Sequence, residues 1–169
     1  MRYTELDLNL SEFHTHLKQE TRKFASEVLH PAGMALDQMP AEDVIKKGSI
    51  YWQTMKKMYE NGYHLAMLSK EYGGMELDGL ATHIFSEELC YGSQGLAASI
   101  FTSAYVALLA QITGNKRLID HFIVPFVHCK DASIMSCAAQ TEPDHGTDLN
   151  MPGTEYFHDK NIIHNVKAV

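Results

Sequence analysis

The stretch SCAAQTEPDHGTDLN, Ser136 to Asn150, marks the point at which the pattern of this chain changes. It joins a run of small residues to Pro, Gly and Asp, which are typical of strands and turns. The residues before it instead carry apolar side chains at helical spacing. We therefore expect two parts, a helical domain over residues 1–132 and the start of a β-domain over residues 133–169.

Upstream of this boundary, apolar residues recur at the spacing of one helix face. The first such face comprises Leu10, Phe13, Leu17, Phe24 and Val28. Ser11 or Asn9 can cap this helix, and His30-Pro31 is expected to end it, because proline disfavours a helical residue before it.

Further helices are predicted after Pro40, around Trp52 to Tyr59, from Asp78, from about Ser93 to Thr113, and over Leu118 to Ile123 until Pro125. The β-like runs are Ala132 to Gln140 and Ile162 to Val169. The predicted fold class is all-α, a bundle of five or six helices followed by a short, truncated β segment.

Charge and composition restrict the classes of function. The 169 residues include only 14 Lys and Arg, the net charge is -7, and no basic run occurs, which argues against nucleic-acid binding. The N-terminus shows neither a secretory nor a transit pattern. Three scattered cysteines suit reduced thiols, so we expect a cytoplasmic protein.

One segment, Leu89 to Asn115, has no charged side chain. A membrane-spanning helix needs about 20 predominantly apolar residues. Serine, threonine, glutamine and glycine interrupt this segment, which favours a helix buried in a protein core over a membrane span.

Neither a metal site nor a catalytic residue is expected from the side chains. Among ten histidines, only Glu27 and His30 have the Glu-x-x-His spacing of di-iron bundles, and they lack partners. Glu87 and Glu88 are neighbours, which do not face each other on a helix. We expect one of these carboxylates to pair with another helix and the other to be solvated.

The segment from Thr141 to Asp148, Thr-Glu-Pro-Asp-His-Gly-Thr-Asp, offers backbone N–H groups, two hydroxyls and little side-chain bulk. Such a surface can lie flat against a planar ring and a phosphate. A cofactor cradle and an ordinary turn between strands are equally compatible with these residues.

This segment resembles the Thr-Glu-Pro-x-x-Gly-Ser-Asp signature of the acyl-CoA dehydrogenase family. Glu71-Tyr72-Gly73-Gly74 resembles that family's Glu-x-x-Gly-Gly loop, and Ser86-Glu87-Glu88-Leu89-x-Tyr91 resembles its Ser-Glu-Glu-Leu-x-Tyr helix. Gly114-Asn115 with Leu118 to Pro125 resembles the segment that leads to the first strand. The motifs are collinear, and the resemblance covers about residues 10 to 169.

The resemblance implies an enzyme with an N-terminal helical domain, a middle β-domain and a C-terminal four-helix domain. Such enzymes hold FAD and oxidise the Cα–Cβ bond of an acyl-CoA thioester, and most pass electrons to an electron-transferring flavoprotein. The catalytic base lies in the C-terminal domain, so no residue of this chain is assigned to that role. We expect the N-terminal part of a longer enzyme that forms a homo-oligomer.

By the same resemblance, the cofactor-binding residues are expected to be Ala138, Ala139, Gln140, Thr141, Gly146 and Thr147. The substrate-binding residues are expected to be Ala97, Ala98, Phe101, Tyr105 and Thr147. Phe101 and Tyr105 are four residues apart and share a helix face, which favours a short, branched or cyclic acyl group. Packing of both rings into the core is an equally weighted alternative.

Three positions depart from the family pattern. Ala138 stands where an aromatic residue is common, Gln140 where an aliphatic one is usual, and Ser69 where proline is usual. These departures leave the acyl chain length open. Two alternatives also remain, a non-catalytic subunit or scaffold that docks onto a flavoprotein partner, and an acyl-CoA oxidase of the same fold.

Overall fold

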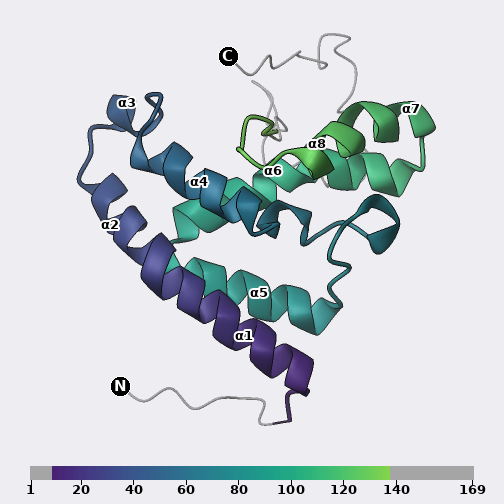
Figure 1. Ribbon diagram of the computed structural model, residues 1–169, viewed down its shortest axis with the longest axis horizontal. Coiled ribbons are helices and arrows are strands. Elements are labelled where there is room, and N and C mark those ends of the chain that lie inside the picture. Colours follow the sequence, from purple (N-terminus) through teal and green to yellow (C-terminus); the bar gives the residue numbers. More distant parts are fainter. Residues whose placement is uncertain (1–8, 138–169) are drawn as a thin grey trace, which may run out of the picture.

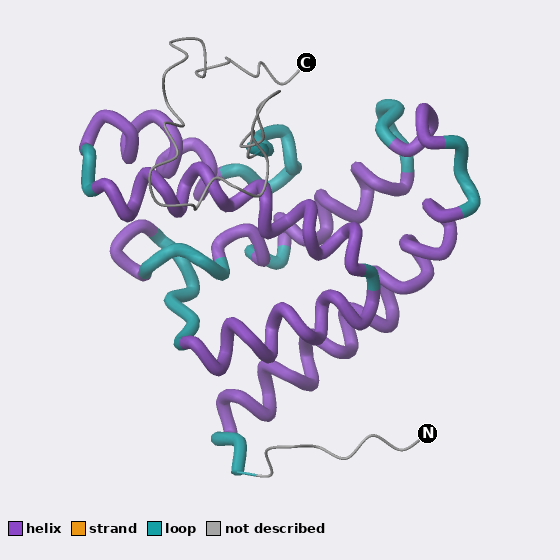
Figure 2. Tube along the Cα trace, turned by 180° about the vertical axis from the view of Figure 1, so that it is seen from behind, coloured by secondary structure: helices purple, strands orange, loops and turns teal. Residues whose placement is uncertain are grey.

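The computed structural model describes residues 9–137, and the structural statements below refer to this part of the chain. Within it the secondary structure is helical, with no strand (Figure 2). The all-α fold class is confirmed for this region. Residues 132–137 of the first predicted β-like run are described and form no strand, while residues 138–140 and all of the second run lie outside the described residues.

The helices are α1 (Glu12–Phe24), α2 (His30–Asp37), α3 (Ala41–Val44), α4 (Ile50–Glu60), α5 (Gly79–Gly92), α6 (Gln94–Thr113), α7 (Lys116–Leu118) and α8 (Val124–His128). Short 3-10 turns cover Tyr63–Leu65 and Lys70–Tyr72. Two π-helical segments, Ala25–Leu29 and Ile119–Ile123, join α1 to α2 and α7 to α8.

The two prolines predicted to end helices do not end them. Pro31 lies in the first turn of α2 and Pro125 in the first turn of α8, and each helix runs on past its proline. Each proline follows a π-helical segment, whose last turn closes from the N–H of His30 to Ala25 and from that of Val124 to Ile119. This wider turn gives the proline ring a position resembling a helix start, where its missing N–H costs little.

The helices pack around two neighbours, α5 and α6. Helix α1 lies along α5, which packs on α6, while α6 also contacts α4 and the π-helical segment before α8 (Figure 1). The fully buried large side chains at these contacts include Tyr59, Phe85, Leu29, Met55, Met58, Leu68, Leu89, Ile100 and Ile123. One core therefore connects the helices of the described region.

Three of the predicted helix starts are confirmed, and the predicted caps Ser11 and Asp78 are both in place. The Ser11 side chain accepts from the His14 N–H, Asp78 from the Ala81 N–H, and Ser93 from the Leu96 N–H. The His14 ring lies between two of these caps, 2.7 Å from Ser11 Oγ and 3.3 Å from Asp78 Oδ1. It thereby links the starts of α1 and α5.

The Glu71-Tyr72-Gly73-Gly74 loop folds back on the residues before it. Gly73 has φ +86°, and a Cβ on Gly74 would lie 1.9 Å from the Leu68 carbonyl oxygen. The loop is held by Gly74 N–H to Ser69, and by Glu76 N–H to Leu68. Both glycines are therefore required, Gly73 for its positive φ and Gly74 because its backbone lies against the backbone of Leu68.

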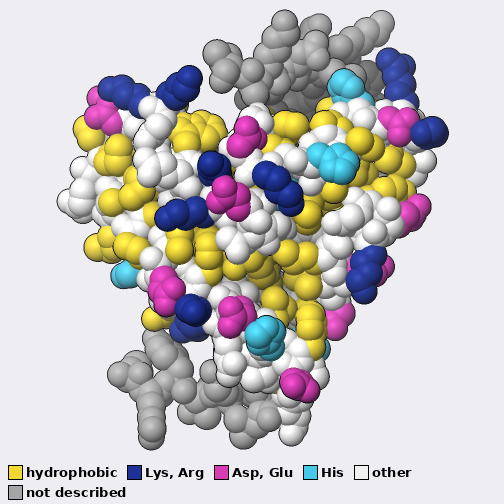
Figure 3. Space-filling model, in the orientation of Figure 1, with side chains coloured by type: hydrophobic (Ala, Val, Ile, Leu, Met, Phe, Trp, Pro, Cys, Tyr) yellow, Lys and Arg dark blue, Asp and Glu magenta, His cyan; other side chains and the backbone are white. Residues whose placement is uncertain are grey.

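The face seen in Figure 1 carries charges of both signs. Lys, Arg, Asp and Glu side chains are interspersed there, with hydrophobic side chains between them (Figure 3). Such a mixed surface gives no single-sign field on this face.

Candidate functional site

The long helix α6 has an inward and an outward face. Its buried residues are Leu96, Ala97, Ile100, Ser103, Ala104, Ala107 and Ala110. Its exposed residues include Ala98, Thr102, Tyr105, Leu109 and Ile112, which recur at intervals of three and four. The helix therefore has an exposed, uncharged face within the described part of the chain. We call this row, from Ala98 to Ile112, the outer face of α6.

The structure divides the predicted substrate residues between these two faces. Ala98 and Tyr105 lie on the outer face, and Tyr105 is 43% exposed. Ala97 is fully buried, and the partly buried Phe101 ring lies edge-on to Phe85 at 6.2 Å. The contacts of Ala97 and Phe101 are thus those of core residues.

Thr102 shares the outer face with Ala98 and Tyr105, and sequence reasoning missed it. The helix carries no charge and its few polar residues form no stripe, so its sequence does not indicate which residues face outward. A seven-residue spacing from Ala98 to Tyr105 is the signal that would have placed the two together.

The last described residues are fastened to α4 and α6. The Tyr59 hydroxyl donates to the Ile134 carbonyl at 2.7 Å. The Ser136 hydroxyl lies 2.8 Å from the Ser103 carbonyl oxygen and 3.3 Å from that of Thr102. The chain therefore reaches the middle of α6 two residues before Ala138. The predicted cofactor-binding residues Ala138, Ala139, Gln140, Thr141, Gly146 and Thr147 lie outside the described residues.

Two titratable rings are stacked where Tyr59 holds these last described residues, 134–137, which we call the exit segment. His64 is fully buried, and its ring lies parallel to that of Tyr59 at a centroid distance of 4.2 Å. Burial, assisted by the positive charge of Lys130, lowers the pKa of His64 to about 4. Burial also raises the pKa of Tyr59. Near neutral pH both rings are therefore uncharged.

The paired carboxylates behave as expected. Glu88 is fully buried and accepts a hydrogen bond from Arg22 of α1, while its neighbour Glu87 is exposed. The Arg22 guanidinium also lies over the Tyr91 ring, 3.7 Å from the centroid. This arrangement fastens α1 to α5, which is a structural role. Among the described residues, no group of three or more His, Cys, Asp or Glu side chains could hold a metal ion.

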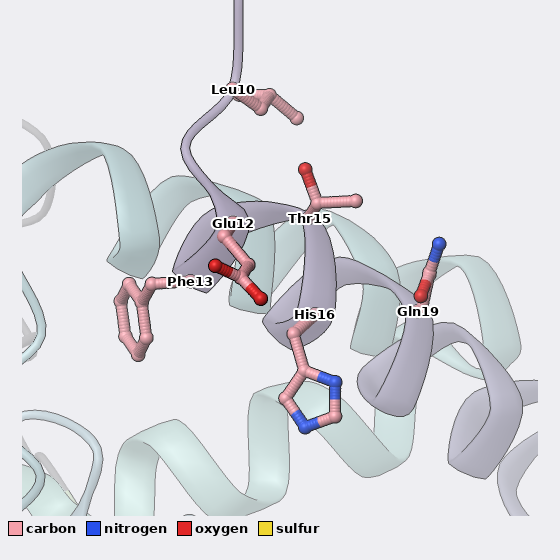
Figure 4. A pocket seen from close by; sticks show the side chains of 6 residues that line it. All are labelled: Leu10, Glu12, Phe13, Thr15, His16 and Gln19. Atoms are coloured by element: carbon pink, nitrogen blue, oxygen red, sulfur yellow. The ribbon is translucent and has the colours of Figure 1, made fainter.

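A surface hollow lies beside the start of α1, lined by Leu10, Glu12, Phe13, Thr15, His16 and Gln19 (Figure 4). The labelled side chains come from α1 and from Leu10, two residues before it, and they spread apart instead of converging. Among the described residues, no second element closes this hollow, so it is shallower than a typical ligand site.

Helix α6 is long and apolar enough, by length and composition, to cross a membrane. Core helices of soluble proteins pass the same test. Seven of its residues are buried against neighbouring helices, and its Gln111 side chain accepts a hydrogen bond from the Ser69 N–H at 2.9 Å. This helix does not establish a membrane span.

Known proteins resemble this chain in both sequence and fold. Residues 11–128 match the family described as acyl-CoA dehydrogenase, N-terminal domain. The chain belongs to the acyl-CoA dehydrogenase family. The resemblance read from the motifs is therefore confirmed, and the family match includes the Glu71–Gly74 loop and the Ser86–Tyr91 helix.

Individual members of the acyl-CoA dehydrogenase family match over most of the chain. The mitochondrial short-chain specific acyl-CoA dehydrogenase of Bos taurus is 30% identical over 152 residues, which are 87% of this chain and 33% of the bovine protein. A solved structure, the FAD complex of PigA, is similar with a TM-score of 0.66 and 25% identity, over 85% of this chain and 36% of that chain.

A glutaryl-coenzyme A dehydrogenase in complex with glutaryl-CoA has a TM-score of 0.62 and 26% identity, over 85% of this chain and 35% of that chain. This chain thus spans about a third of the length of the family members it matches. The activities in the names of those proteins belong to their complete, longer chains.

Proposed function

We propose that this chain supplies the helical domain and the start of the flavin site of an FAD-dependent acyl-CoA dehydrogenase. The reaction is the oxidation of the Cα–Cβ bond of an acyl-CoA thioester. One observation carries the proposal: the Ser136 hydroxyl donates hydrogen bonds to the backbone carbonyl oxygens of Thr102 and Ser103. The segment expected to hold the flavin thus begins two residues beyond a point held to the middle of α6, a helix that carries no charged residue.

That placement is compatible with a bound flavin beside an acyl chain. Ala138, Ala139, Gln140, Thr141, Gly146 and Thr147 would hold the FAD, and its chemistry there is to accept the hydride from Cβ. Ala98 and Tyr105 would line one wall for the acyl group, together with Thr147. Ala97 and Phe101 would support that wall from the core side. The proposal assigns no catalytic base to this chain.

The proposed partners follow the family. Electrons would pass to an electron-transferring flavoprotein, and the complete protein would form a homo-oligomer in the cytoplasm. The family membership of the chain supports the first two assignments, whereas the cytoplasmic location rests on its sparse, unpaired cysteines.

The test is anaerobic reduction of the flavin. The protein is expressed from its complete gene and should carry bound FAD, whose absorbance near 450 nm should bleach when butyryl-CoA is added, but not with CoA alone. Bound flavin that no acyl-CoA bleaches, or absence of flavin, would overturn the dehydrogenase assignment and favour a non-catalytic subunit. Steady peroxide formation in air would identify an oxidase.

A further inference from the structure

Two hydrogen bonds anchor the exit segment to two different helices. The Tyr59 hydroxyl of α4 donates to the Ile134 carbonyl at 2.7 Å. Two residues further on, the Ser136 hydroxyl donates to the Ser103 carbonyl of α6 at 2.8 Å. One hydrogen bond fixes a single point of a chain and leaves the chain free to turn about it, whereas two anchors also fix its direction. The direction of the exit segment is therefore determined by α4 and α6 together.

The two anchors meet at Ser103, whose side chain is buried in α6. The Ser103 hydroxyl donates to the Ser99 carbonyl at 2.7 Å. Burial raises the pKa of Tyr59, and hydrogen bonding to the Ser103 side chain partly offsets this effect, so the two hydroxyls lie beside each other. The Ser103 carbonyl also accepts from Ser136. Hydroxyl groups from α4, α6 and the exit segment thus form one connected cluster in the protein interior.

The acceptors of Ser136 are backbone groups and not side chains. The carbonyls of Thr102 and Ser103 lie in the middle of α6, and each oxygen has a second lone pair besides the one that the helix itself uses. A backbone carbonyl cannot turn away as a side chain can, and α6 is held in place by its seven buried residues. Ser136 is therefore attached to a rigid point, which is the kind of support that a precise binding site needs.

The turn that leads into the exit segment is strained and yet well supported. Ala132 has φ +58° and is buried, although residues other than glycine rarely adopt a positive φ. The Asp131 carboxylate accepts from the Ser133 N–H at 3.1 Å and from Cys129 Sγ at 3.4 Å. Such strain persists only where the surrounding contacts determine the conformation. The direction of the chain is therefore fixed before the exit segment begins and fixed again by its two anchors.

We propose that Ser136 is a positioning residue for the flavin, which holds the flavin-binding segment in place on α6 before the cofactor binds. This inference rests on the proposed function, in which the flavin-binding residues begin at Ala138. At most about 7 Å of chain separates Ala138 from Ser136, so an anchor at Ser136 restricts where that segment can begin. A segment that is already in place binds its ligand more tightly than one that must first be ordered.

The experiment measures FAD binding to the complete protein after its flavin has been removed. Quenching of flavin fluorescence in a stopped-flow instrument gives the association and dissociation rate constants. Ser136→Ala should weaken FAD binding by about three- to tenfold, as expected for the loss of one hydrogen bond. Because the hydroxyl acts before the flavin binds, the association rate constant should fall, while the dissociation rate constant stays within about twofold of wild type. The melting temperature of the flavin-free protein should not change, since the bond holds the exit segment and not the helical core.

Further variants separate the hydroxyl from the size of the side chain. Ser136→Cys keeps the size with a weaker donor and should resemble Ser136→Ala, whereas Ser136→Thr keeps the hydroxyl and should bind FAD like wild type. The matched control is Ser133→Ala, which removes an exposed hydroxyl that lies 3.7 Å from Cys129 Sγ. This control should change neither FAD binding nor the melting temperature.

Three outcomes would overturn the inference. They are equal association rate constants in wild type, Ser136→Ala and Ser136→Cys, a loss confined to the dissociation rate constant, and a loss that follows a lower melting temperature of the flavin-free protein. All three occur in a protein that binds FAD and whose flavin is bleached by an acyl-CoA. Failure of the proposed function is instead the absence of flavin or of bleaching in wild type, which removes this inference as well.

Discussion

Arg22 of α1 and Glu88 of α5 form an ion pair whose carboxylate is buried and whose guanidinium is partly exposed and stacked on Tyr91. Hydrogen bonding to Glu88 raises the pKa of Arg22. The second carboxylate oxygen, Oε1, has no hydrogen-bond partner in the described region. Arg22 is therefore the charge that makes a buried carboxylate tolerable between the two helices.

Replacement of Arg22 by alanine should destabilise the protein strongly. It leaves Glu88 buried without its partner and removes the contact with Tyr91, so we expect a loss of about 3–5 kcal/mol in the free energy of unfolding. Urea unfolding measures this loss.

The double variant Arg22→Met/Glu88→Leu should recover much of that stability, because it removes both charges and keeps similar volume. The exposed neighbour Lys23 is the matched control, and Lys23→Ala should change stability by less than about 0.5 kcal/mol. Equal losses of unfolding free energy in Arg22→Ala and Lys23→Ala would show that the ion pair between Arg22 and Glu88 contributes no more to stability than an exposed lysine.

The loop at Gly73-Gly74 predicts a contrast between two glycines. Gly74→Ala places a methyl group against the Leu68 carbonyl, where backbone must move, and should cost at least about 2 kcal/mol. Gly79→Ala, in the first turn of α5, has open space around the new Cβ. It should stabilise by about 0.5–1 kcal/mol, because alanine favours a helix. Thermal unfolding of the two variants decides, and similar melting temperatures would contradict the close approach.

The buried His64 predicts a loss of stability in acid. Its pKa is lowered from the ordinary 6.5 to about 4, so the unfolded chain takes up a proton that the folded chain resists. This contribution is complete above about pH 6.5 and is lost as the pH falls towards 4, by about 3 kcal/mol in total. His64→Phe keeps an aromatic ring against Tyr59 and should flatten that part of the pH profile. An identical slope in wild type and variant between pH 6.5 and 4 would disprove the assignment.

The Tyr59 hydroxyl predicts a local effect on the exit segment. Tyr59→Phe removes the hydrogen bond to the Ile134 carbonyl and leaves the buried ring in place, at a cost of about 1–2 kcal/mol. Trypsin should then cleave faster after the exposed Lys130, while cleavage after Lys57 on α4 serves as the internal control. Equal acceleration at both sites would indicate global destabilisation instead of release of this segment.

Much of the helical fold could be predicted because residues close to each helix end determine where the helix starts and stops. The side chains of Asp78 and Ser93 each cap a helix by accepting a hydrogen bond from the backbone N–H three residues further on. Gly62, with φ +74°, follows α4 as expected. The burial of single side chains was less predictable. Leu17 and Phe24 pack against the core as the first apolar face predicted, but Phe13 is 54% exposed. Which residues are covered depends on where α5 lies, and the spacing within α1 does not contain that information.

The rotation of α6 about its axis could not be predicted from the sequence for a related reason. An uncharged helix whose few polar residues form no stripe has no inward face that its own sequence marks. Its rotation is fixed by distant partners, namely Phe85 against Phe101 and Ser69 against Gln111. The predicted substrate residues Ala97 and Phe101 came out on the inner face for this reason, while Ala98 and Tyr105 came out on the outer one.

The two π-helical segments have a consequence for comparing this chain with its relatives. A turn that closes over five residues holds one residue more than an α-helical turn, and each α-helical residue corresponds to a rotation of about 100°. A relative with an uninterrupted α-helix here would need one residue fewer between Phe24 and His30 to present the same faces of α1 and α2. An alignment without a gap would then pair the buried Ala32 with a residue about a quarter-turn away. Position-by-position transfer between relatives is therefore sound only within each stretch bounded by these segments.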